Sequence, residues 1–153
     1  MPTSYLTRQG FDKLQDELEH LRTVKRQEVA VRLHEAMEGG ELIEDAEYEA
    51  AKNEQAFVEG RIQELEILLA NARIVEESGK REIVQVGAKV TIQEDELEPE
   101  IFTVVGPAEA NPRAGRISHE SPLGRALMDH RAGDKVKVDA PDGPFYVQLL
   151  KVE

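Results

Sequence analysis

The sequence predicts an α+β protein in which a long antiparallel helical hairpin is followed by a small β-rich domain. Through the first half, apolar residues recur at three- and four-residue spacing, which is typical of a coiled coil. Beyond Arg81 the apolar period changes to two and β-branched residues become frequent, which is typical of strands. We therefore expect a coiled-coil hairpin over 1–75 with its tip at 39–48, a linker over 76–81 and a globular domain over 82–153.

Two helices are predicted for the hairpin. The first begins after Thr7, a favourable N-cap residue, and ends at Gly39-Gly40, because glycine is common just past a helix end. Its apolar seam is predicted at Phe11, Leu14, Leu18 and Leu21 and, with a slight shift in phase, at Val24, Val29, Leu33 and Ala36. The second helix is predicted from about Glu44 to Ala72, with its seam at Ala51, Val58, Ile62, Leu65, Leu69 and Ala72 and with Phe57 and Leu68 beside it.

The second half carries strand and turn signals. Strands are predicted over 83–86, 88–92 and 101–105. Ser121-Pro122 places an N-cap and an N1 proline before a short helix. A β-hairpin is predicted from the apolar runs 136–138 and 145–150, which flank a turn containing Gly143. We therefore expect a small twisted sheet covered by one helix.

Composition excludes several classes of protein. The chain has 31 acidic and 19 basic residues, and a net charge of −12 argues against nucleic-acid binding by the whole surface. The absence of cysteine excludes disulfides, thiolate zinc sites and cysteine nucleophiles, and it fits a reducing cytoplasm. The chain has neither a long apolar run nor a secretory signal pattern, so we expect a cytoplasmic protein without a membrane span. The four histidines lack metal-ligand spacing.

The predicted tip is strongly acidic. Seven carboxylates and no Lys or Arg occur between Glu35 and Glu49, although like charges this close repel one another. Glu41 and Glu44 are about one helical turn apart, within reach of a shared hard cation. The alternative is a solvated acidic cap that keeps the end of the hairpin soluble.

Two motifs resemble those of the bacterial GreA/GreB transcript cleavage factors, and the resemblance covers essentially the whole chain. The run from Glu41 to Gln55, Glu-Leu-Ile-Glu-Asp-Ala-Glu-Tyr-Glu-Ala-Ala-Lys-Asn-Glu-Gln, is similar to the family's tip motif. Ser121-Pro122-Leu123-Gly124-Arg125-Ala126-Leu127, with Gly133-Asp134 following, is similar to the family's Ser-Pro-[Ile/Leu]-Gly-x-Ala-Leu.

The resemblance implies a transcription elongation factor that is not an enzyme by itself. Its FKBP-like second domain would dock on RNA polymerase, and its hairpin would enter the secondary channel as a monomer. At the tip, Glu41 and Glu44 would be the catalytic and metal-binding pair. They would hold Mg²⁺ jointly with the polymerase's own aspartates, and bind none alone, to promote hydrolysis of backtracked RNA.

The resemblance also implies contact residues. Asp45, Tyr48 and Lys52 would lie near the RNA 3′ end or the polymerase, and Ser121, Pro122, Leu123 and Gly124 would contact the polymerase. For Tyr48 two roles remain open, stacking on a base and packing over Ala51.

Two departures from the family pattern keep an alternative function open. Glu41 stands where the family usually has Asp, and Asp45 where it has Asn. Because Mg²⁺ geometry is strict, the extra methylene of Glu41 bears directly on cleavage. The alternative is a Gre-like inhibitor that occupies the same channel without productive cleavage, and a third reading is a generic coiled-coil adaptor.

The first helix also has a basic side, formed by Arg22, Lys25, Arg26 and Arg32. One interpretation is a patch that touches RNA or polymerase. The other is a solvated face with pairs inside the helix, such as Glu28 with Arg32.

Overall fold

The computed structural model describes residues 3–38, 45–77 and 81–153 and divides the chain into two compact units. One unit is Asp12–Asn71, and the other joins Met1–Phe11 to Ala72–Glu153. This division differs from the one predicted from the sequence, because both ends of the 1–75 segment belong to the globular unit. The predicted α+β class is confirmed.

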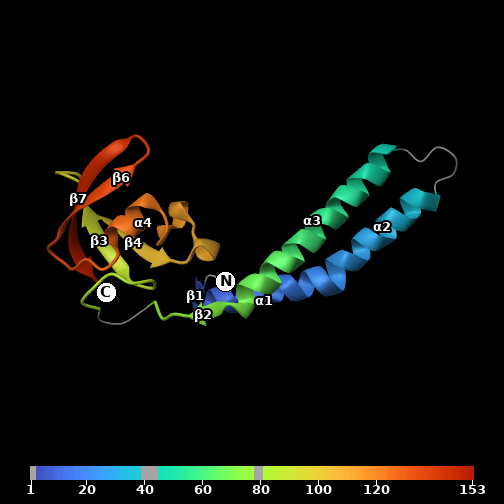
Figure 1. The fold of residues 1–153 in the computed structure, drawn as a ribbon, viewed down its shortest axis with the longest axis horizontal. Helices are drawn as coiled ribbons and strands as arrows, with labels where there is room; N and C mark the ends of the chain where they lie inside the picture. The colour runs from blue at the N-terminus through green and yellow to red at the C-terminus, as the bar shows by residue number, and fades with distance from the viewer. Residues whose placement is uncertain (1–2, 39–44, 78–80) are drawn as a thin grey trace. The chain divides into compact units, whose positions relative to one another are not determined.

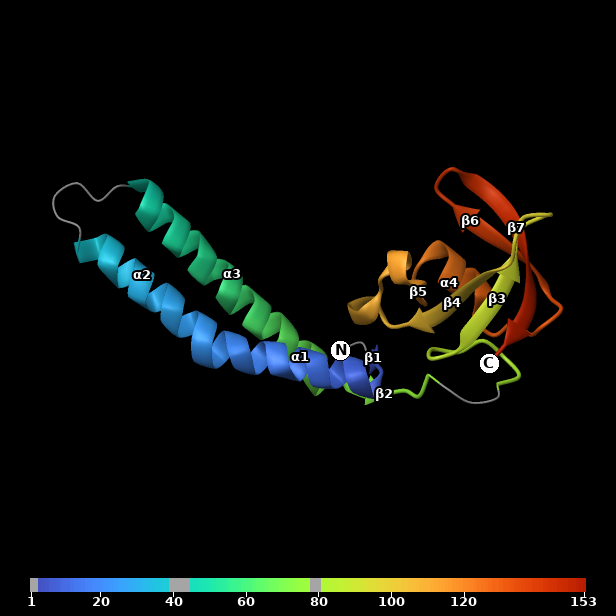
Figure 2. The same cartoon turned by 180° about the vertical axis from the view of Figure 1, so that it is seen from behind.

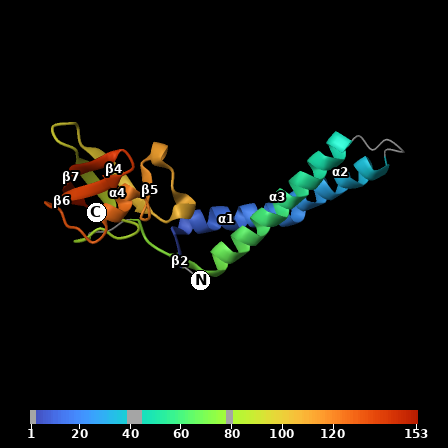
Figure 3. The same cartoon turned by 45° about the horizontal axis from the view of Figure 1, so that its top comes forward.

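The hairpin is built from α1 (Arg8–His20), a π-helical turn (Leu21–Lys25), α2 (Arg26–Glu38) and α3 (Asp45–Ala70). The first turn of α1 belongs to the globular unit. Figure 1, Figure 2 and Figure 3 all show α2 and α3 side by side and antiparallel. The seam between the helices buries Leu18, Val29, Val58, Ile62 and Leu65, with Leu14, Leu21 and Leu69 packed around them.

The π-helical turn corrects one part of the predicted seam. The backbone N–H of Arg26 donates to the carbonyl of Leu21, five residues earlier, whereas an α-helix bonds over four. The extra residue rotates the chain, so Val24 is 41% exposed while Val29 is 1% exposed. The prediction that Val24 lies in the seam was therefore wrong, and the phase shift seen in the sequence is a π turn.

The globular unit contains a five-stranded sheet in the order β5-β4-β3-β7-β6. Its strands are β3 (Lys89–Gln93), β4 (Glu100–Val105), β5 (Arg116–Ser118), β6 (Lys135–Ala140) and β7 (Gly143–Val152). Neighbours are antiparallel except β4 and β5, which are parallel. Helix α4 (Pro122–Leu127) contributes Leu127 to the core, which also contains Val90, Val104, Val138 and Leu149. In Figure 2, α4 lies against this sheet.

Two parts of this unit differ from the prediction. Residues 83–86 form no strand beyond an isolated bridge between Ile83 and Arg131, although Val84 and Val86 are buried. In the other direction, β1 (Ser4–Leu6) and β2 (Ala72–Ile74) pair in parallel and were not predicted. Each strand is only three residues long and pairs with a partner remote in sequence, so the local sequence pattern gives little signal for it.

Candidate functional site

The predicted metal pair, Glu41 and Glu44, lies outside the described residues. On either side of it, α2 ends at Glu38 and α3 begins at Asp45. Glu38 is paired with His34 at 2.9 Å. Among the residues that the structure describes, no group of three or more His, Asp or Glu side chains is arranged to hold a metal ion.

The start of α3 carries the other predicted tip contacts. Asp45 is its first residue, Tyr48 is partly buried and Lys52 is exposed. Ala51, one turn beyond Tyr48, is 4% exposed and marks the inner side of the helix. Tyr48 therefore lies near the edge of the seam, whereas Lys52 is available to solvent or to a partner.

The basic side of the first helix is engaged across the hairpin. Each of its four cations is paired with a glutamate of α3: Arg22 with Glu66 (2.9 Å), Lys25 with Glu54 (3.1 Å), Arg26 with Glu59 (2.8 Å) and Arg32 with Glu54 (2.6 Å). The sequence suggested an ion pair inside the helix between Arg32 and Glu28, but Arg32 pairs with Glu54 of α3 instead. Each ion pair is exposed to solvent and therefore contributes little to the stability of the hairpin by itself. Together the four pairs hold the two helices in register.

The titration of Glu54 follows from this arrangement. Its hydrogen bond with Arg32, and then that with Lys25, hold the pKa of the Glu54 carboxyl below its ordinary value of 4.5. The hydrogen bond with Glu54 raises the pKa of the Arg32 guanidinium, and the hydrogen bond with Glu59 raises the pKa of the Arg26 guanidinium.

The Ser121–Gly124 segment, which is the N-cap and first turn of α4, is fixed by the fold. The Ser121 hydroxyl oxygen accepts from the Gly124 N–H at 3.1 Å, and the hydroxyl group donates to the Ser118 carbonyl at 2.6 Å. A Cβ on Gly124 would lie 2.0 Å from that same carbonyl oxygen, so a side chain cannot fit there. Pro122 is exposed, and Leu123 packs against the core. Ser121 and Gly124 thus have structural roles, and Pro122 is the exposed member of this segment.

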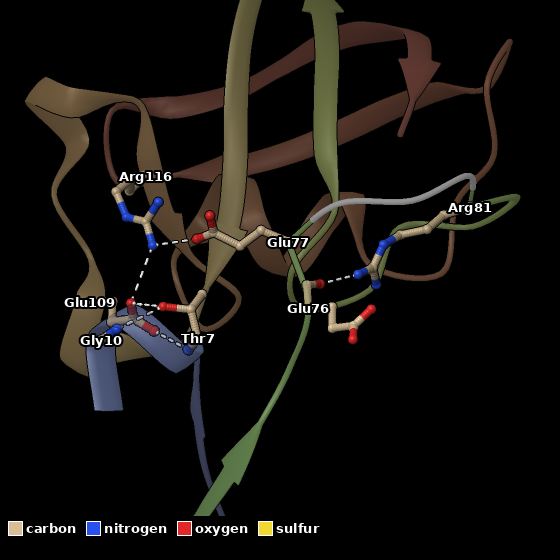
Figure 4. A network of polar contacts seen from close by, with 7 residues as sticks. All are labelled: Thr7, Gly10, Glu76, Glu77, Arg81, Glu109 and Arg116. Atoms are coloured by element: carbon tan, nitrogen blue, oxygen red, sulfur yellow. Dashed lines mark hydrogen bonds and ion pairs between the residues drawn. The ribbon is translucent and has the colours of Figure 1, made fainter. Parts of the chain in front are cut away.

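Sequence reasoning missed a polar network that fastens the start of α1 (Figure 4). Glu109 accepts hydrogen bonds from the backbone N–H and the hydroxyl of Thr7, at 2.7 and 2.6 Å. Arg116 reaches both Glu109, at 3.3 Å, and Glu77, at 2.5 Å. Glu77 belongs to the predicted linker, which is therefore tied to the globular unit at this residue. The partners are as many as 102 residues apart, and no local pattern signals such pairing.

A helical hairpin joined to a small sheet is the architecture of a class of transcription elongation factors, and both halves of this chain match that class. Residues 4–74 match the family described as "Transcription elongation factor, N-terminal", and residues 79–153 match "Transcription elongation factor, GreA/GreB, C-term". The chain belongs to the GreA/GreB family of transcription elongation factors.

Individual relatives are similar in sequence to this chain along nearly its full length. The chain is 46% identical over 150 residues to transcription elongation factor GreA of Thermomicrobium roseum, covering 97% of this chain and 96% of the relative. It is 49% identical over 151 residues to GreA of Chloroflexus aurantiacus, with the same coverage. Among solved structures, GreA factor homolog 1 of Thermus thermophilus is 35% identical over 99% of both chains, with a TM-score of 0.46.

Among the described residues, no helix is long and apolar enough to cross a membrane.

Proposed function

We propose that this protein binds RNA polymerase, inserts its hairpin into the secondary channel and stimulates Mg²⁺-dependent hydrolysis of backtracked nascent RNA. It acts there as a cytoplasmic monomer and is not an enzyme by itself. The observation that carries the proposal is the braced hairpin. Helix α3 has 26 residues, about 39 Å at ~1.5 Å per residue, and both an apolar seam and cross-hairpin ion pairs bind it to its partner helices. Such a rod can carry an acidic tip into a narrow channel.

The donor set at the tip fits Mg²⁺. Glu41 and Glu44 offer carboxylate oxygens, the ligands that this hard cation prefers, and two carboxylates leave most of an octahedral shell to other donors. The pair is therefore suited to completing a site with the polymerase. When bound, the metal supplies stabilisation of the attacking and leaving oxygens in a phosphodiester hydrolysis.

The remaining predicted contacts extend this proposal. Asp45, Tyr48 and Lys52 lie near the RNA 3′ end or the polymerase, and the exposed charge of Lys52 suits a phosphate. Pro122 and Leu123, held by the Ser121 cap and the close packing of Gly124, belong to the surface of the globular unit that docks on the polymerase.

A second candidate function is supported by Glu41 and Asp45. Both residues depart from the family's usual Asp and Asn, and the added length or charge alters how a metal is held. The protein would then occupy the channel as an inhibitor, without productive cleavage.

A stalled, backtracked elongation complex with labelled RNA and Mg²⁺ separates these functions. We expect the protein to release short 3′ fragments faster than polymerase alone, and we expect Glu41→Ala and Glu44→Ala to abolish this release while leaving polymerase binding intact. Glu49→Ala, which removes an exposed carboxylate from α3, is the matched control and should retain activity. Slowed nucleotide addition without cleavage would identify the inhibitor, and rescue of cleavage by Glu41→Asp would assign the cause to one methylene.

A further inference from the structure

The five-stranded sheet has one face that packs on the core with α4 and a second face that does not. Side chains alternate along a strand, so the residues between the buried ones point to the second face. On β6, Val136 is buried while Lys135 and Lys137 are exposed, and on β3 the buried Val90 follows the exposed Lys89. We call this second face the open face.

Strand β7 alternates in the same way, with one irregularity. Its pairing with β3 shifts register, as at a β-bulge. Leu149 and Val152 both contact the core, so the two exposed residues between them, Leu150 and Lys151, both lie on the open face. Tyr146, earlier on this strand, is exposed as well. The residues that define the open face are Lys89, Lys135, Lys137, Tyr146, Leu150 and Lys151.

The open face is basic, although the protein is acidic. It holds four of the chain's eight lysines, whereas the net charge of the whole chain is −12. Two carboxylate side chains accompany these lysines. Asp139 lies 4.0 Å from Lys137, and Glu153 pairs with Lys151. The hydrogen bond with Lys151, and then the charge of Lys89, hold the pKa of the Glu153 carboxyl below its ordinary value of 4.5. Four lysines thus share two carboxylate side chains, so positive charge is in excess.

An exposed aromatic ring lies among these lysines. Tyr146 is 49% exposed and faces Lys137 directly in the pairing of β6 with β7. The Nζ of Lys135 lies 5.3 Å from the centre of the Tyr146 ring. Further along β7, Leu150 adds an apolar surface that is 39% exposed. A flat group stacked on Tyr146 therefore has two positive charges close beside it.

Protection of the sheet edge explains only part of this surface. Strand β6 is an edge strand, and lysines on an edge discourage pairing with other chains. This reason covers Lys135 and Lys137. Lys89 and Lys151 lie on β3 and β7, which have a paired strand on both sides, so no edge needs protection there. The exposed ring of Tyr146 does not protect an edge either.

We propose that the open face binds single-stranded RNA, with Tyr146 stacking on a base and the lysines contacting phosphates. An aromatic ring beside positive charges on an exposed sheet binds single strands with little regard to sequence, because every base has a face to stack and every nucleotide carries a phosphate. In a double strand the bases stack on one another and are not available to the ring. This site is separate from the contacts proposed for the tip, and it acts without polymerase.

The first test measures binding of the full-length protein to a short, fluorescein-labelled oligo(U) RNA by fluorescence anisotropy over a range of salt concentrations. We expect Lys135→Gln/Lys137→Gln to weaken binding about 5-fold at low salt and to reduce the slope of log K against log salt by about 1.4, or ~0.7 for each lost phosphate contact. The control, Lys13→Gln/Arg113→Gln, removes two exposed positive charges outside these strands and should stay within about twofold of the unmodified protein.

Variants of Tyr146 test the stacking. Tyr146→Leu removes the ring and should weaken binding about 5-fold or more, whereas Tyr146→Phe keeps the ring and should stay within about twofold. A loss with the lysine variant alone would overturn the proposal, because a surface for any polyanion needs no ring. Thermal melts of each variant identify any loss of binding that comes from misfolding.

The outcomes are independent of the proposed function, because no polymerase is present. Absence of RNA binding, binding that resists all the open-face variants, or a double-stranded RNA bound as tightly as oligo(U) would each overturn this inference and leave the proposed function untouched.

NMR spectroscopy locates the bound RNA directly. Oligo(U) is titrated into the isotope-labelled full-length protein, and the backbone amide signals are followed. We expect the largest shifts on β3, β6 and β7, at residues such as Lys137, Gln148 and Leu150. Shifts confined to the helical hairpin would overturn the proposal.

Discussion

Glu109 receives two hydrogen bonds from Thr7, one from the backbone N–H and one from the hydroxyl. The Thr7 hydroxyl oxygen also accepts from the Gly10 N–H at 3.0 Å, so it caps α1 and bonds to Glu109 at once. Glu109 ends a 3₁₀ turn (Pro107–Glu109), and its side chain is 10% exposed. A carboxylate at this place complements the positive end of the helix dipole. The start of the hairpin's first helix is therefore capped by the globular unit.

Gly10 tests how tightly this contact is built. A Cβ at Gly10 would lie 2.1 Å from a Glu109 carboxylate oxygen, and Glu109 cannot move without losing its bonds to Thr7. We expect Glu109→Ala to lower the free energy of unfolding by about 1–3 kcal/mol. Gly10→Ala should destabilise the unmodified protein but stabilise the Glu109→Ala variant by up to ~1 kcal/mol, because alanine favours helix. Urea unfolding of the two single variants and the double variant measures the coupling between Gly10 and Glu109. Additive changes in the free energy of unfolding would contradict this coupling.

The lowered pKa of Glu54 makes the hairpin sensitive to acid. Because the folded-state pKa lies below the ordinary value of 4.5, the ion pairs stabilise the hairpin fully above that value, and this stability is lost as pH falls through the folded pKa. Arg32→Gln removes the largest cause and should raise the pKa of Glu54, as followed by NMR titration of its side-chain carboxyl carbon. Lys52→Gln removes an equal charge two residues from Glu54 and should leave this pKa unchanged.

The π-helical turn predicts an unusual tolerance to deletion. Deleting Val24, which is exposed, allows the turn to become α-helical with the seam residues on both sides still facing α3. We expect the melting temperature to fall by only a few degrees. Deleting Gln63 from the regular helix α3 rotates one side of its seam by about 100° and should abolish cooperative unfolding of the hairpin. Thermal unfolding of both variants is measured by circular dichroism. Similar losses of thermal stability in the two would show that the π turn is not a one-residue insertion.

Two glycines respond oppositely to the same substitution. Gly124→Ala places a methyl group against the Ser118 carbonyl oxygen in a rigid backbone, and we expect a loss of about 3 kcal/mol. Gly60 lies inside α3, where a Cβ would meet no atom within 4 Å, so Gly60→Ala should raise stability by about 0.5–1 kcal/mol. Chemical denaturation distinguishes the two, and a neutral Gly124→Ala would mean that the Ser118 carbonyl can shift.

Local patterns predicted most of the elements because each pattern reports a local physical preference. Thr7 caps α1 and Ser121 caps α4 as expected, since capping depends on residues three positions away. The β6–β7 hairpin turns at Pro141-Asp142, and Gly143, the first residue of β7, has a φ of 121° that glycine adopts readily. The acidic tip was equally visible in the sequence, and its metal pair remains a prediction.

By itself, the sequence determined the α+β class, most of the hairpin seam, the caps and the family, because periodicity and long motifs are written in neighbouring residues. Only the tertiary structure decided where the units divide, which glutamates of α3 pair with the basic side of the first helix, and how Glu109 holds Thr7. It also formed a cavity in the globular unit that is lined by residues of β3, β4, β7, α4 and the turn between β3 and β4. These features join residues far apart along the chain, and their energies depend on distances that exist only after folding.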